Sequence, residues 1–186
     1  MNPLTSRLFR TLLPPALVAA ALALPATYSG GQASAQESAT LVYLVRHAEK
    51  EAEPADDPPL TPEGRGRSEF LANLLKHSGL THIHSTPFTR TRQTAQPVAD
   101  STGLEILEYN PLNLEGMADT LRRTPGRHLV VGHSNTTPVL VEMLGGDPGE
   151  PIDEATEYDR LYLLVLHDDG EVSTILLRSV KSESGG

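Results

Sequence analysis

The sequence predicts an α/β domain, a three-layer sandwich with a mainly parallel central sheet and an antiparallel hairpin at the C-terminal end. Short apolar runs that suit strands alternate with stretches of helical periodicity, and continuous apolar strands are typical of a parallel sheet covered on both faces. The predicted strands are Leu41–Val45, His82–Ser85, Leu104–Leu107, His128–Val131, Leu161–Leu166 and Val172–Leu177. The last two form the hairpin, with a turn at Asp168–Gly170.

Four helices are expected between these strands. Thr61 and Pro62 suit the start of the first helix, as N-cap and first-turn residue, and Gly79 suits its end. The second is expected from Phe88 to about Ala95, because Pro97 lacks a backbone donor and should break or kink it. The third and fourth helices are predicted over Glu115–Arg123 and Thr137–Leu144.

Composition narrows the class of protein. The 186 residues include 15 Lys and Arg against 24 Asp and Glu, a net charge of −9, which disfavours a nucleic-acid-binding surface. The chain has no Cys, which excludes disulfides, thiolate metal sites and a cysteine nucleophile.

The N-terminal segment has the pattern of a secretory signal peptide. Arg7 and Arg10 precede an apolar run from Ala16 to Leu24, which is shorter than the roughly 20 residues that span a bilayer. Ala33–Ala35 is a small-residue cleavage site, so residues 1–35 are expected to be a signal and residues 36–186 the domain. We expect export to the periplasm or the extracellular space without stable membrane insertion after cleavage; an uncleaved anchor is the alternative.

Polar residues follow three of the predicted strands. Arg46 and His47 end the first, Arg90 comes shortly after the second, and His133 follows the fourth. Ligands of open α/β sheets bind beyond the C-terminal ends of the strands, so these side chains are expected to share one crevice. Guanidinium groups bind phosphate, and a neutral imidazole can attack phosphorus without a metal ion or cofactor. A carboxyl group would then protonate the leaving oxygen.

Four segments carry a family resemblance. Leu44–Glu49 resembles the Arg-His signature of the histidine phosphatase superfamily, which has the phosphoglycerate-mutase-like fold. Leu60–Gly64 is similar to the family's Leu-Thr-x-x-Gly helix start, Ser85–Ala95 to its Ser-x-Pro-x-x-Arg-x-x-Gln-Thr-Ala block, and Val131–Thr136 to its second Gly-His block. The four segments occur in the family's order.

The resemblance implies a small phosphatase that forms a phosphohistidine. It makes His47 the nucleophile, with Arg46, Arg90 and His133 around the phosphate. Asn135, which follows the fourth strand, is a candidate helix cap and a further candidate contact with the ligand. Ala48 stands where the family usually has Gly. Glu115 falls about where the family places its proton donor. Other candidates for that role are Glu49, Asp56, Asp57 and Asp119.

Other polar residues are expected to be structural or solvated. His82 and His84 face the same way on a strand and are interpreted as structural or rim residues, and His128 as solvated. Arg92 is assigned to the surface, and the acidic run from Asp153 to Asp159 to a solvated loop.

Two other functions compete with an exported phosphatase acting on small phosphorylated substrates. Gly132–Thr136 resembles a nucleophile elbow, and Ser134 with Asp159 and His167 would make a serine hydrolase; Thr136 replaces the second Gly of that pattern. A non-catalytic phosphate-binding module is the other alternative. A mutase is less favoured, because the long insertions typical of mutases are absent from the sequence.

Overall fold

The computed structural model describes residues 39–179, so the predicted signal segment 1–35 lies outside the described residues. The strands are β1 (Thr40–Arg46), β2 (His82–Ser85), β3 (Ile106–Glu108), β4 (Arg127–Gly132), β5 (Arg160–Leu166) and β6 (Val172–Arg178). The helices are α1 (Pro62–Leu75), α2 (Thr89–Thr102), α3 (Leu114–Arg123) and α4 (Thr137–Met143). None of the helices in residues 39–179 combines the length and the apolar character needed to cross a bilayer.

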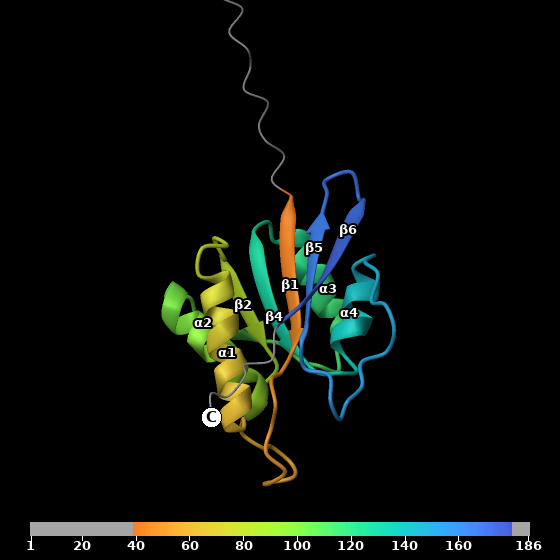
Figure 1. Cartoon of the computed structure of the whole chain (residues 1–186). Coiled ribbons are helices and arrows are strands. Elements are labelled where there is room, and N and C mark those ends of the chain that lie inside the picture. The colour runs from red at the N-terminus through yellow and green to blue at the C-terminus, as the bar shows by residue number, and fades with distance from the viewer. Residues whose placement is uncertain (1–38, 180–186) are drawn as a thin grey trace, which may run out of the picture. The chain divides into compact units, whose positions relative to one another are not determined.

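The predicted fold class is confirmed. The strands form one six-stranded sheet in the order β3-β2-β4-β1-β5-β6. Neighbours from β3 to β1 are parallel, whereas β5 runs antiparallel to β1 and β6 antiparallel to β5. Helices α1 and α2 cover one face of this sheet, and α3 and α4 cover the other (Figure 1).

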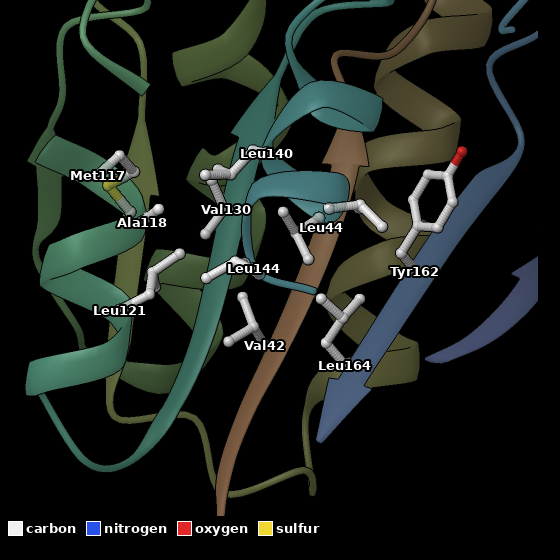
Figure 2. Close-up of a cluster of buried hydrophobic side chains, with 11 residues drawn as sticks. Val42, Leu44, Met117, Ala118, Leu121, Val130, Leu140, Leu144, Tyr162 and Leu164 are labelled. Atoms are coloured by element: carbon white, nitrogen blue, oxygen red, sulfur yellow. The ribbon is translucent and has the colours of Figure 1, made fainter. Parts of the chain in front are cut away.

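Each face of the sheet has its own hydrophobic core, because successive strand residues point to opposite faces. On β4, Val130 packs with the α3 and α4 residues, whereas Leu129 and Val131 pack with α1 and α2. Figure 2 shows the first cluster, in which Val42, Leu44 and Val130 lie between the helices and the sheet. Burial on both faces therefore specifies the strand register.

The Leu-Thr-x-x-Gly segment has a packing explanation. Thr61 is the N-cap of α1, and its hydroxyl accepts a hydrogen bond of 3.0 Å from the backbone nitrogen of Gly64. A Cβ atom on Gly64 would lie 2.1 Å from the carbonyl oxygen of Glu49. Glycine at this position therefore lets α1 pack against the chain that leaves β1.

The helix break expected at Pro97 does not occur, because α2 continues to Thr102. Val98 and Ala99 follow the proline and are buried against the sheet. Their burial in the core favours the continued helix despite the hydrogen bond that a proline removes. The helix ends where Gly103 adopts a left-handed conformation, with φ of 72°.

Three histidines stack on the α3 side of β2 and β4. The rings of His82 and His128 lie 4.5 Å apart at an interplanar angle of 8°, and Nε2 of His84 lies 3.0 Å from Nδ1 of His128. The solvated position predicted for His128 is wrong: its side chain is fully buried, and Nε2 donates to the carbonyl of Thr124. Burial lowers the pKa of His84 to about 4 and also lowers that of His128.

We expect the free energy of unfolding to decrease as the pH falls from about 7 to about 5. The unfolded chain takes up protons on these histidines near their ordinary pKa of 6.5, whereas burial keeps His84 neutral to about pH 4. Each histidine that is protonated only in the unfolded chain reduces stability by ~1.4 kcal/mol per pH unit. Urea titrations at the two pH values measure the change.

The variant His84→Gln should show a smaller pH dependence, with His77→Gln, at an exposed position, as the matched control. An equal pH dependence of the unfolding free energy in His84→Gln and in the unsubstituted protein would contradict the lowered pKa of His84.

Candidate active site

Parallel pairing brings three strand ends to one edge of the sheet. In the register, Arg46 at the end of β1 lies opposite Gly132 at the end of β4, and Ser85 at the end of β2 lies opposite Val131. The residues that follow these strands, His47, Thr86 and His133, therefore meet. The rings of His47 and His133 are 5.5 Å apart, although the two residues are far apart in the sequence.

His47 is held in one tautomer by the backbone. Its amide donates to the carbonyl of Gly132 at 2.9 Å, which continues the β1–β4 ladder by one residue. Its Nδ1 lies 2.8 Å from the carbonyl oxygen of Ala48, so Nδ1 carries the proton and Nε2 carries the lone pair. Ala48, at the position where the family usually has Gly, is fully buried, and its amide donates to Thr94.

His133 is held by side chains from α2 and the segment before it. Its Nε2 lies 3.0 Å from the hydroxyl of Thr86, and its Nδ1 lies 3.5 Å from NH2 of Arg90. Because a guanidinium group can only donate, Nδ1 accepts and Nε2 donates to Thr86. The ring of Phe88 meets His133 edge-on at 5.2 Å.

Both imidazoles are neutral at physiological pH. Burial, followed by the positive charges of neighbouring Arg46 and Arg90, lowers the pKa of His47 to about 3. The pKa of His133 falls to about 4, again chiefly through burial and then through Arg90 and Arg46. His47 thus has an unprotonated nitrogen available for nucleophilic attack.

Arg46 is anchored to the segment before β5. Its terminal nitrogens donate to the carbonyl oxygens of Asp153, Glu154 and Glu157, at 3.3, 2.7 and 2.9 Å. The guanidinium carbon lies 3.9 Å from the ring centroid of Tyr158, a cation–π arrangement. This side chain holds the 153–158 segment against the end of β1.

Arg90, in the first turn of α2, completes the cluster. Its guanidinium carbon lies 4.5 Å from the Phe88 ring centroid, and NH1 lies 3.7 Å from Asp57. Within residues 39–179, two buried side-chain polar atoms lack a hydrogen-bond partner, and they are Nε of Arg46 and Nε of Arg90. Buried donors without partners are costly and rare, so these two nitrogens suit an anionic ligand.

A cavity of about 430 Å³ beside this cluster is lined by His47, His133, Arg90 and Asn135, whereas Arg46 is not among its lining residues. Arg92 lies elsewhere, exposed and paired with Glu108 at 3.1 Å, as the sequence predicted. In the described part of the chain, no group of three or more His, Cys, Asp or Glu side chains could hold a metal ion.

The predicted proton-donor candidates do not line this cavity. Glu115 lies in the first turn of α3 and is exposed, and Asp119 pairs with arginines on the same helix. Glu49 is ion-paired with Arg67, Asp57 accepts two hydrogen bonds from Thr89, and Asp56 is exposed. The carboxyl group that lines the cavity is instead that of Glu154.

The serine hydrolase arrangement is not assembled. The hydroxyl of Ser134 donates to Glu154 at 2.8 Å, and Asp159 pairs with Arg178. His167 follows β5, which runs antiparallel to β1, so it lies at the opposite edge of the sheet from Arg46.

Three residues of the site have no distinguishing sequence pattern. Thr86 lies within the Ser85–Ala95 block, and Glu154 and Tyr158 lie within the acidic run from Asp153 to Asp159, which is expected to be a solvated loop. The contacts of Glu154 and Tyr158 with Arg46 join segments more than 100 residues apart, which local sequence patterns do not reveal.

Fold and site together define an α/β protein that presents two neutral imidazoles and two guanidinium groups at one sheet edge. The family model described as the histidine phosphatase superfamily (branch 1) matches residues 42–113, which confirms the resemblance that the sequence predicts.

Curated relatives match part of the chain. The probable phosphoglycerate mutase GpmB of Serratia proteamaculans is 38% identical over 72 residues, which cover 36% of this chain and 34% of that protein. Its counterpart in Escherichia fergusonii is 40% identical over 72 residues, with the same coverage. The matched segment thus spans about a third of the length of these relatives.

Solved structures share the fold. The protein histidine phosphatase SixA complexed with tungstate is 20% identical, with a TM-score of 0.61 over 75% of this chain and 97% of that chain. Phosphoserine phosphatase from Entamoeba histolytica, in complex with 3-phosphoglyceric acid, is 15% identical, with a TM-score of 0.59 over 76% and 98%. At these identities the likeness shows the fold alone.

We expect His47 and His133 to remain neutral in the folded protein at about pH 5. Burial and two nearby guanidinium groups lower both pKa values, so protonation should begin only towards pH 4 or below. Histidine side-chain NMR spectra recorded from about pH 7 to about pH 4 measure this directly. A transition of His47 near its ordinary value of 6.5 would contradict the prediction.

Proposed function

We propose that this chain is a metal-independent phosphatase that hydrolyses small phosphate monoesters through a phosphohistidine on Nε2 of His47. The observation that carries the proposal is the pair of buried, unpartnered Nε atoms of Arg46 and Arg90 beside a neutral imidazole. A phosphoryl group would supply the acceptors that these donors lack.

The proposed chemistry has two steps. In the first, Nε2 of His47 forms a bond to phosphorus while the bond to the leaving oxygen breaks, and a carboxyl group gives that oxygen a proton. In the second, water attacks the phosphohistidine and releases phosphate. Arg46 and Arg90 donate to the phosphoryl oxygens, where negative charge is concentrated, and the ring of His133 lies beside them. The positive charge of two arginines makes a bound metal unnecessary.

We expect His47→Ala to lose at least about 10³-fold of the turnover of p-nitrophenyl phosphate, because the nucleophile is removed. It should also lose the covalent phosphate that an alkaline quench traps in the unsubstituted enzyme. The matched control is His77→Ala at an exposed position, which should keep both. Turnover should persist in EDTA.

A non-catalytic module would bind phosphate yet turn over no ester, and that result would overturn the proposal. Equal amounts of covalent phosphate trapped in His47→Ala and in the unsubstituted enzyme would also overturn it.

The relatives named as phosphoglycerate mutases suggest a second candidate, in which the phosphoryl group passes to a second phosphoglycerate instead of water. Labelled phosphoenzyme, incubated with and without 2- or 3-phosphoglycerate, separates the two. Release of the labelled phosphoryl group as inorganic phosphate, both with and without phosphoglycerate, supports the phosphatase.

We also propose that the protein is exported, from the signal pattern in residues 1–35. N-terminal sequencing of the protein from a periplasmic or secreted fraction tests this, and a mature chain that starts at Gln36 is expected.

A further inference from the structure

The cavity over His47 and His133 is lined by one carboxyl group, that of Glu154, among the residues that the structure describes. The sequence places this residue in an acidic run between α4 and β5, with no sign of a role in catalysis. The fold brings it to the sheet edge because Arg46 binds its backbone carbonyl at 2.7 Å.

Two contacts position the carboxyl group itself. The hydroxyl of Ser134, which follows His133, donates to Oε2 of Glu154 at 2.8 Å. The other oxygen, Oε1, lies 4.0 Å from NH2 of Arg46. The carboxyl group therefore lies between Ser134 and Arg46, while most of its side chain, 73%, is open to solvent and to an incoming ligand.

We propose that Glu154 is the proton donor of the reaction, an inference that rests on the phosphatase function proposed above. The other candidates do not line the cavity, and Glu49 among them is ion-paired with Arg67.

The proton balance follows from this position. As the His47–phosphorus bond forms and the phosphorus–oxygen bond breaks, the proton of Glu154 passes to the leaving oxygen, which departs as an alcohol. The resulting carboxylate then accepts a proton from the water that attacks the phosphohistidine. Glu154 ends the cycle protonated, and His47 ends it neutral.

The test compares two leaving groups of similar size. The p-nitrophenolate ion leaves readily without a proton, whereas the phenolate of phenyl phosphate gains much more from protonation. Removing a general acid typically costs about 10²-fold or more. We expect Glu154→Gln to lower kcat/KM for phenyl phosphate by about 10²-fold. The ratio of kcat/KM for p-nitrophenyl phosphate to kcat/KM for phenyl phosphate should increase at least about 10-fold.

The ratio of kcat/KM values isolates this step. It reports events up to departure of the leaving group, so the later hydrolysis of the phosphohistidine does not affect it. A general loss of folded protein cancels in the ratio. Glutamine also keeps an oxygen that can accept the hydrogen bond from Ser134.

Two matched variants complete the experiment. Glu142→Gln removes a carboxyl group that lines the adjacent cavity with Ser134 but does not line the cavity over His47, and its ratio should match that of the unsubstituted enzyme. Glu115→Gln tests the donor expected from the sequence, and its ratio should also match.

The outcomes separate the two proposals. An unchanged ratio in Glu154→Gln, or a widened ratio in Glu115→Gln, overturns the role of Glu154 and leaves the phosphatase standing. Absence of turnover of both esters by the unsubstituted enzyme overturns the phosphatase function itself.

Discussion

The parallel register of β1, β4 and β2 is the constraint on which the site depends. It places Arg46 opposite Gly132 and Ser85 opposite Val131, so that the residues just beyond these strands meet at one edge. A shift of one residue would turn every side chain of a strand to the other face of the sheet. The two hydrophobic cores oppose that shift, because β1 and β4 carry side chains that pack in both of them. The packing far from the site therefore decides its geometry.

The site itself opposes stability. Burial keeps two imidazoles neutral, and two arginines hold a buried nitrogen without a partner. Such unsatisfied groups cost free energy in the unliganded protein, and a ligand with acceptor oxygens relieves that cost. Departures from complete hydrogen bonding are expected at functional sites, where the rest of the fold compensates for them. The unpartnered atoms of Arg46 and Arg90 are thus informative because the remaining buried polar side chains of residues 39–179 are satisfied.

Arg46 links the sheet to the segment that borders the cavity. Its terminal nitrogens donate to three backbone carbonyls while the guanidinium plane packs on Tyr158, and its Nε has no hydrogen-bond partner. A lysine ammonium is a single point charge and could not reproduce this combination. The position of Glu154 at the cavity therefore depends on the same side chain that is proposed to bind phosphate.

The sequence by itself determined the order of strands and helices along the chain, the antiparallel hairpin, and the candidate residues His47, Arg90 and His133 that follow three of the strands, since these come from local periodicity and short motifs. Tertiary structure decided where the long-range contacts fall. The continuation of α2 through Pro97, the burial of His128, and the meeting of Arg46 with the 153–158 segment all depend on packing between distant parts of the chain. Local patterns report which face of an element is apolar, but they do not report what that face will meet.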